Sequence, residues 1–161
     1  MNSSTLFFLT LQPRYNSLVP QSDKLHVLFV CLGNACRSPM AESIARHHAS
    51  DIIEPSSAGL YPLGSISGLT LQTLLANGYP VDGLSSKPLH PEALHDSDLV
   101  INLTGQPIDH LFTRHPNVED WNVEDPYGQD PATYQRILDE IESRVLSLAT
   151  RLRAVQPAAN S

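Results

Sequence analysis

The sequence is poor in cysteine, in basic residues and in long hydrophobic runs, and each shortage excludes a class of protein. Two cysteines among 161 residues are too few for a disulfide-rich secreted scaffold. They form a C-x4-C pair without suitably spaced histidines, which is not the ligand set of a zinc site. We therefore expect a reducing, cytoplasmic location, no bound metal and no other cofactor.

Basic residues are few and scattered. Ten lysines and arginines stand against seventeen acidic residues, the formal net charge is -7, and the basic residues nowhere form a run. The chain thus lacks the electrostatic footprint of a nucleic-acid-binding protein. An anionic ligand would need a local positive site.

No hydrophobic run is long enough to span a membrane. The segment "LFFLTL" near the N-terminus has six residues and no positive residue before it, so it predicts neither a signal peptide nor a membrane span. We expect residues 1–24 to form a poorly ordered extension, residues 25–153 to form one domain, and residues 154–161 to form a short tail. No membrane partner is expected, and the sequence gives no indication of the oligomeric state.

What the sequence does contain is an alternation of strand-like and helix-like segments. Buried strands are predicted over residues 25–30 and 98–103, with a strand end near Ser57 and a weaker strand over 117–123. Helices are predicted after Ser38 as N-cap with Pro39 in the first position, over 68–77 before Gly78, and over 106–116. A last amphipathic helix follows from apolar residues at helical spacing: Tyr134, Ile137, Leu138, Ile141, Val145, Leu148 and Leu152. This alternation predicts βαβ units, a parallel sheet and ligands at the carboxyl ends of its strands.

The stretch "CLGNACRS" lies between the first strand and the first helix. Gly33 and Asn34 tolerate positive φ, so successive N–H groups of this loop can point inward and bind an anion. The helix N-terminus adds partial positive charge, and Arg37 can bind two phosphate oxygens at once. Such a cradle favours the thiolate form of Cys31. The loop therefore predicts a nucleophilic cysteine beside an oxyanion site.

The motif "VLFVCLGNACRSPMAE" closely resembles the phosphate-binding loop of low-molecular-weight protein tyrosine phosphatases, a family shared with one class of arsenate reductases. The segments "SSAG" at 56–59 and "EDPYG" at 124–128 resemble two further family signatures. The resemblance covers residues 25 to about 153. Together with the alternation, it implies an α/β three-layer sandwich with a central, mainly four-stranded parallel sheet and a phosphate-binding loop after the first strand.

The resemblance also implies roles for individual residues. Cys31 would be the nucleophile that forms a phosphocysteine, Arg37 would bind the phosphoryl oxygens, and Asp125 would protonate the leaving oxygen. Asn34, Ser38 and Ser57 would support the loop, with Ser38 bonded to the sulfur of Cys31. The predicted phosphate-binding residues are Leu32, Gly33, Asn34, Ala35, Cys36, Arg37 and Ser38.

Some residues have two interpretations. Cys36 either forms a disulfide with Cys31 on oxidation, as family members can, or is inert. Asp125 before Pro126 could only initiate a turn. Leu32 and Tyr127 are predicted at the mouth of the site, although Tyr127 could simply pack. Where many family members have a supporting histidine, this chain has Leu84. Gly128 follows Asp-Pro-Tyr where many members have a second aromatic residue, and the aromatic residue usual on the opposite wall is not evident.

Three functions are compatible with these residues. The first is hydrolysis of phosphotyrosine in proteins, or of similar small aryl phosphates. The second is arsenate reduction with a small-molecule thiol, since no cysteine follows Cys36 to serve a thioredoxin-coupled reaction. The third is non-catalytic phosphate binding, which the combination of Cys31, Arg37 and Asp125 disfavours.

Overall fold

A four-stranded parallel sheet forms the centre of the molecule. The structure is a computed structural model that describes residues 24–112 and 114–155. Its strands lie in the order β2-β1-β3-β4, and all neighbours are parallel. Their bounds are β1 Leu25–Cys31, β2 Ile53–Gly59, β3 Leu99–Asn102 and β4 Val118–Asp120. The predicted parallel sheet is confirmed.

Strand β1 lies between β2 and β3 in the interior of the sheet. Six of its seven residues are buried, as expected for the continuous apolar run "LHVLFVC" with helices on both faces. The chain leaves β1 towards β2 and later returns to β3 on the other side. The carboxyl end of β1 is therefore the point where strand order reverses, and ligands of open α/β sheets bind at such points.

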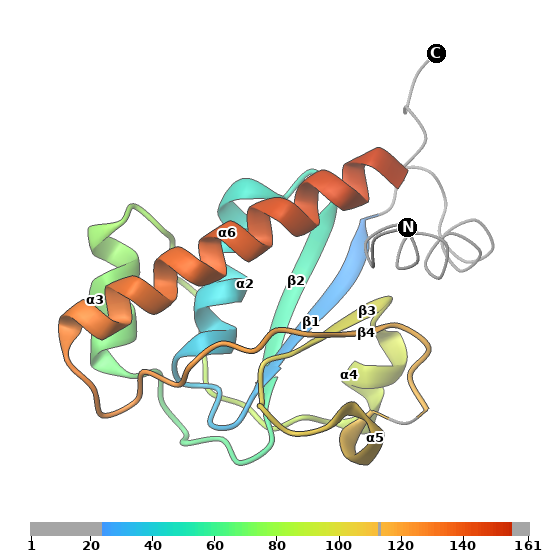
Figure 1. Ribbon diagram of the computed structural model, residues 1–161, viewed down its shortest axis with the longest axis horizontal. Helices are drawn as coiled ribbons and strands as arrows, with labels where there is room; N and C mark the ends of the chain where they lie inside the picture. Colours follow the sequence, from blue (N-terminus) through green and yellow to red (C-terminus); the bar gives the residue numbers. More distant parts are fainter. Residues whose placement is uncertain (1–23, 113, 156–161) are drawn as a thin grey trace.

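Helices cover both faces of the sheet and make a three-layer sandwich, which confirms the predicted fold class (Figure 1). On one face lie α2 Arg37–His48, α3 Gly68–Ala76 and α6 Pro131–Val155. On the other lie the shorter helices α4 Pro91–Asp96 and α5 Ile108–Leu111. Each loop at the carboxyl edge of the sheet therefore begins at a strand of the central layer and leads to a helix of an outer layer.

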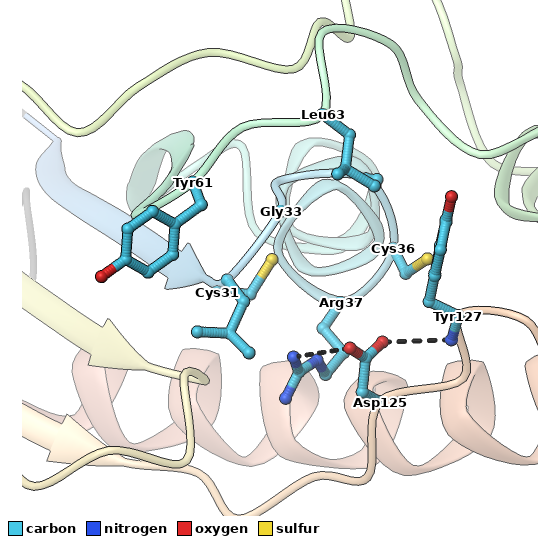
Figure 2. A pocket seen from close by; sticks show the side chains of 10 residues that line it. Cys31, Gly33, Cys36, Arg37, Tyr61, Leu63, Asp125 and Tyr127 are labelled. Carbon is cyan, nitrogen blue, oxygen red and sulfur yellow. Dashed lines mark hydrogen bonds and ion pairs between the residues drawn. The ribbon is translucent and has the colours of Figure 1, made fainter.

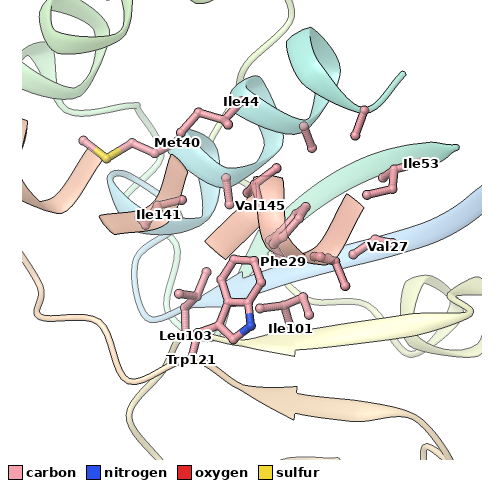
Figure 3. Close-up of a cluster of buried hydrophobic side chains, with 14 of the residues drawn as sticks. Val27, Phe29, Met40, Ile44, Ile53, Ile101, Leu103, Trp121, Ile141 and Val145 are labelled. Atoms are coloured by element: carbon pink, nitrogen blue, oxygen red, sulfur yellow. The ribbon is translucent and has the colours of Figure 1, made fainter. Parts of the chain in front are cut away.

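The larger of two hydrophobic clusters lies under α2 and α6 (Figure 3). The predicted stripe of α6 is confirmed, because all seven of its residues are buried. The rings of Phe29 and Trp121 pack there with centroids 5.8 Å apart. The second cluster joins Leu28, Val30 and Val100 to Phe112 on the opposite face. Alternate residues of β1 thus contribute to both clusters.

Three local predictions were wrong. Helix α2 begins at Arg37 with Cys36 as its N-cap, so Ser38 lies inside the first turn, and its hydroxyl bonds the side chains of Cys31 and Asn34 instead of capping. Pro39 is the third helical residue, where its missing N–H still has no intrahelical carbonyl to bond. The helix predicted over 106–116 is reduced to α5, and α4, which starts at Pro91, was not predicted.

The described residues include nearly all of the predicted domain. Helix α6 continues to Val155, two residues past the predicted domain end. The predicted extension, apart from Lys24, and the tail from residue 156 lie outside the described residues. No helix within 24–112 or 114–155 is long and apolar enough to cross a membrane.

Candidate active site

The loop after β1 is held in a curved shape with its carbonyl groups outward. Asn34 has a positive φ of 47°, which reverses the chain direction locally. Outer loops donate to the carbonyls of the curve: Leu60 N to Cys31 O, Tyr61 N to Leu32 O, Leu63 N to Gly33 O, and Ser67 N to Ala35 O. Because these carbonyls are bonded on the outside, the amide edges of the loop face inward. This arrangement is a nest for an anion.

Gly59 allows the loop to sit directly against β2. A Cβ atom on Gly59 would lie 2.8 Å from the backbone N of Asn34 and 2.8 Å from the carbonyl O of Leu32. Only glycine fits this approach, which gives a physical reason for the last residue of the "SSAG" segment. The end of β2 is thus part of the loop's support.

The side chains of Asn34, Ser38 and Ser57 form a buried network behind the loop. Asn34 Nδ2 donates to Ser38 Oγ at 2.8 Å and to Ser57 Oγ at 3.0 Å. Ser38 Oγ lies 2.9 Å from the sulfur of Cys31. The structure therefore brings together the three supporting residues predicted from the sequence. None of them is among the residues that line the pocket, although Asn34 and Ser38 were also predicted to bind phosphate.

Arg37 and Asp125 meet across the pocket from segments far apart in the sequence (Figure 2). The Arg37 side chain is 5% exposed, and its Nη1 donates to the carbonyls of Leu103 at 2.7 Å and Val123 at 3.2 Å. Its Nη2 lies 3.3 Å from Asp125 Oδ2, while Asp125 Oδ1 accepts from the backbone N of Tyr127. Two backbone carbonyls thus fix the guanidinium with one edge toward the pocket.

The Nε atom of Arg37 is buried and has no hydrogen-bond partner within residues 24–112 and 114–155. A buried N–H of a charged group is costly to leave unbonded. The geometry around it, with a nest of amides and a cysteine sulfur, suits an oxyanion as the missing acceptor.

The pocket has mixed walls (Figure 2). Its lining comprises Cys31, Leu32, Gly33, Ala35, Cys36, Arg37, Tyr61, Leu63, Asp125 and Tyr127. Leu32 and Tyr127, which the sequence predicts at the mouth of the site, are both among the lining residues. Tyr61 and Leu63 were not predicted, and they provide the opposite wall, with exposed fractions of 72% and 53%. Their position just after β2, the neighbour of β1, was the available signal for them.

Cys36, the last loop residue before α2, is buried, and its sulfur lies 3.5 Å from the hydroxyl of Tyr134. Burial raises the pKa of the Cys36 thiol, although hydrogen bonds to Tyr134 and Thr70 oppose this shift. Burial also raises the pKa of Tyr134, to about 12. At neutral pH both groups therefore carry their protons.

Leu84 does not support the loop. It is partly buried and packs against the larger hydrophobic cluster. The corresponding contacts come from its neighbours: Ser86 Oγ donates to Gly33 O at 3.0 Å, and the backbone N of Lys87 donates to Asn34 Oδ1 at 2.9 Å. Two residues that sequence reasoning did not consider thus hold the loop from outside.

The described part of the chain contains no group of three or more histidine, cysteine, aspartate or glutamate side chains arranged to hold a metal ion. The chemistry that the described residues offer is a sulfur nucleophile, a fixed guanidinium, a nest of amides and a half-exposed carboxylate.

Known proteins with similar sequences and structures carry out two kinds of reaction. An arsenate reductase of Bacillus licheniformis is 33% identical over 134 residues, which covers 78% of this chain and 96% of that protein. The YwlE arginine phosphatase of Geobacillus stearothermophilus superposes with a TM-score of 0.75 at 27% identity, covering 82% of this chain and 95% of that one. A low molecular weight protein tyrosine phosphatase of T. tengcongensis superposes with a TM-score of 0.71 at 28% identity, covering 80% of this chain and all of the other, 100%.

Residues 26–158 match the model of the low molecular weight phosphotyrosine protein phosphatase family. This range includes every residue that lines the pocket, and it includes the segments "SSAG" at 56–59 and "EDPYG" at 124–128. The relatives show that one fold serves phosphatases and arsenate reductases alike. By its sequence match and its fold, this chain belongs to the low molecular weight phosphotyrosine protein phosphatase family.

Proposed function

We propose that this protein is a cysteine-dependent phosphatase that hydrolyses phosphotyrosine or similar aryl phosphate monoesters through a phosphocysteine intermediate. The observation that carries the proposal is the buried Nε of Arg37, which has no hydrogen-bond partner within the part of the chain that the structure describes and belongs to a residue that lines the same pocket as Cys31. A phosphoryl group in the nest would supply the acceptor for Nε and would place its phosphorus next to the nucleophile.

In the first step the Cys31 thiolate attacks phosphorus. The S–P bond forms, the ester P–O bond breaks, and the leaving oxygen takes a proton from the carboxyl group of Asp125. Asp125 is suited to this role because its side chain is 44% exposed at the open side of the pocket while its Oδ1 is fixed by the Tyr127 N–H.

In the second step a water molecule attacks the phosphocysteine. The Asp125 carboxylate takes a proton from the water, the S–P bond breaks, and inorganic phosphate leaves. Arg37 and the loop amides stabilise the negative charge of the equatorial oxygens in both steps. Ser38, at 2.9 Å from the sulfur, stabilises Cys31 as a leaving group in the second step.

The mouth of the pocket supports an aryl substrate. Tyr61 and Leu63 face Tyr127 across the opening, and all three are largely exposed, at 72%, 53% and 57%. Flat apolar walls on two sides suit an aromatic ring whose phosphate reaches the loop. A cytoplasmic location and a phosphotyrosine-containing protein partner remain predictions from the sequence.

The second candidate is arsenate reduction with a small-molecule thiol, favoured by the name of the B. licheniformis relative. The nest would hold arsenate as it holds phosphate. The sequence contains only Cys31 and Cys36, both in the loop, so a reduction that passes through a further cysteine has no residue for it. Arsenate reduction would therefore depend on an external thiol, whereas the phosphatase reaction needs no thiol besides Cys31, and for this reason we prefer the phosphatase.

Parallel assays of the purified protein distinguish these functions. The substrates are phenyl phosphate, a phosphotyrosine peptide, a phosphoarginine peptide, and arsenate with glutathione. We expect turnover of both aryl phosphates, its complete loss in Cys31→Ser, and retained phosphate binding by that variant, because serine is a far weaker nucleophile at neutral pH. Turnover of arsenate alone, of phosphoarginine alone, or an active Cys31→Ser would contradict the proposal.

A further inference from the structure

A buried carboxylate lies at the far end of the network behind the loop. Glu42, in α2, is 2% exposed. Its Oε1 accepts from Ser57 Oγ at 2.6 Å and lies 3.8 Å from Lys87 Nζ, and its Oε2 pairs with Arg46. The proposed mechanism gives this group no role, yet Ser57, Asn34 and Ser38 connect it to the sulfur of Cys31.

Glu42 determines which way the protons of the network point. A carboxylate only accepts hydrogen bonds, so the hydroxyl hydrogen of Ser57 must be donated to Glu42. Ser57 then accepts one N–H of Asn34, whose orientation is fixed because its Oδ1 accepts from the backbone N of Lys87. The other N–H of Asn34 goes to Ser38.

Ser38 therefore receives a hydrogen bond and has its own proton to give. The sulfur of Cys31, at 2.9 Å, is its nearest acceptor, and the competing carbonyl of Ala58 is 3.5 Å away. The direction of the whole network thus makes Ser38 a donor to the sulfur, which favours the thiolate.

The negative charge of the Glu42 carboxylate also disfavours other negative charges nearby. An uncompensated negative charge behind the loop would oppose the thiolate and the bound phosphate alike. Two cations are present, but they differ in position. Arg46 meets only Oε2 and also donates to the carbonyl of Asp82, whereas Lys87 lies beside Oε1 and within 3.5 Å of Ser57 Oγ.

We propose that Lys87 is a positioning residue: its ammonium group compensates the Glu42 carboxylate at the network end, and its backbone N–H orients Asn34, so that Ser38 donates to Cys31 without an opposing charge behind the loop. The kinetic consequence rests on the proposed function, while the effect on the Cys31 thiolate does not. Lys87 takes this place in a loop where Leu84 cannot contribute a charge.

The other charged or titratable groups around Cys31 stay constant in the test. Within the described residues, the pocket wall contributes Arg37 from α2, Cys36 from the loop and Asp125 from the segment before α6. Tyr61 and Tyr127 complete the ionisable lining. A change in the Cys31 profile on replacing Lys87 is therefore not caused by a substitution among these groups.

The test is the pH profile of Cys31 alkylation by iodoacetamide, read by tandem mass spectrometry of the tryptic peptide that contains residues 25–37, whose fragments separate Cys31 from Cys36. The variants are Lys87→Met, Lys87→Arg and, as a matched control, Lys24→Met. Lys24 is the only other lysine in the sequence and precedes β1, whereas Cys31 ends that strand. Since Lys87 is 40% exposed, its replacement leaves the core intact.

We expect Lys87→Met to raise the midpoint of the profile by about one pH unit, which lowers kcat/KM for phenyl phosphate about tenfold below the midpoint. Lys87→Arg should restore most of the change, and Lys24→Met should match the wild type. An unchanged midpoint in Lys87→Met, or no rescue by arginine, would overturn the proposal. Alkylation decides this even if the wild type hydrolyses no aryl phosphate, which would contradict only the proposed function.

A double variant separates charge compensation from simple packing. Glu42→Gln retains an oxygen that can accept from Ser57 but removes the charge. Combined with Lys87→Met it removes one negative and one positive charge from the network end and leaves Arg46, so the net charge there equals that of the wild type. The midpoint should therefore return to within about 0.3 units of the wild type. A double variant with a midpoint as high as that of Lys87→Met would contradict compensation of Glu42 by Lys87.

Discussion

At the scale of single residues, two adjacent carboxylates have different surroundings. Asp125 lines the pocket and lies 3.3 Å from Arg37 Nη2. Glu124 points away from it and pairs with Arg136 at 2.7 Å on the surface. Pro126 restricts the backbone of Asp125 to extended conformations, which holds the shorter side chain toward the pocket. For this reason the proposed mechanism uses Asp125, and not Glu124, as the general acid.

Replacing Asp125 with asparagine should slow hydrolysis according to the leaving group. We expect phenyl phosphate turnover to fall about 100-fold and that of p-nitrophenyl phosphate to fall less, because a better anion needs less protonation. Glu124→Gln is the matched control and should change neither rate. A plot of log kcat against leaving-group pKa measures this. An unchanged slope in Asp125→Asn, or a steeper one in Glu124→Gln, would move the acid role elsewhere.

A second prediction at this scale concerns oxidation. If Cys36 closes a disulfide with oxidised Cys31, it must attack as a thiolate. Because burial raises the pKa of Cys36, the thiolate is scarce at neutral pH and becomes commoner as the pH rises. Treatment with one equivalent of peroxide should therefore give more disulfide, and more activity recovered by dithiothreitol, at pH 8.5 than at pH 6.

Intact-mass analysis and thiol titration measure this disulfide. Cys36→Ser is the control and should lose the recoverable fraction at both pH values. Two free thiols after peroxide treatment, or equal recovery in Cys36→Ser, would show that Cys36 is inert. A larger disulfide yield at pH 6 than at pH 8.5 would refute the link to the Cys36 pKa.

At the scale of elements, the site depends on the close contact between the end of β2 and the loop after β1. Gly59 is paired in register with Cys31, and its backbone also bonds the segment around Lys87 and Leu89. Three pieces of chain thus meet at one glycine. The close packing of the end of β2 against the loop, together with the hydrogen bonds from the outer segments, maintains the curvature of the loop.

Gly59→Ala should disrupt this contact. The added Cβ would lie 2.8 Å from two backbone atoms, so the loop must shift. We expect kcat/KM to fall at least about tenfold and the free energy of unfolding to fall by about 1–3 kcal/mol, as for other overpacked sites. Gly68→Ala, where a Cβ meets nothing within 4 Å, is the control for both measurements. Full activity in Gly59→Ala would show that the loop does not need this approach.

At the scale of the whole molecule, the sheet and α6 together provide the rigid base on which the loop rests. The apolar stripe of α6 packs with α2 over the larger cluster, and the start of α6 also contributes Tyr134 beside Cys36. Helix α6 therefore contributes both to the stability of the fold and to the surroundings of the site.

Two leucines of α6 separate these contributions. Leu148 is fully buried, whereas Leu146 is 40% exposed. We expect Leu148→Ala to lower the free energy of unfolding by about 3 kcal/mol and Leu146→Ala by less than about 1 kcal/mol, measured by urea denaturation. Equal losses in the two variants would mean that α6 does not pack as described.

Local pattern in the sequence was enough to predict the frame of the molecule. The run at residues 25–31 and the seven apolar positions of α6 depend on residues near one another, and such spacing predicts a strand and a helix face with little help from distant contacts. The order "CLGNACRS" predicted the position and chemistry of the loop, whereas its curvature depends on the segments that bond it from outside. The parallel sheet follows from their alternation.

The remainder was decided by contacts between residues far apart in the chain. The sequence predicts Ser38 as a helix N-cap, but its hydroxyl bonds the side chains of Cys31 and Asn34 instead. Of the helix predicted over 106–116, the described residues form only α5. Tyr61 reaches the mouth of the pocket only because β2 pairs with β1. Lys87 meets Glu42 across 45 positions of sequence. Sequence pattern determines which segments can form, whereas the buried partners of a polar side chain depend on how the segments pack, because a buried polar group must be satisfied by whatever the fold brings to it.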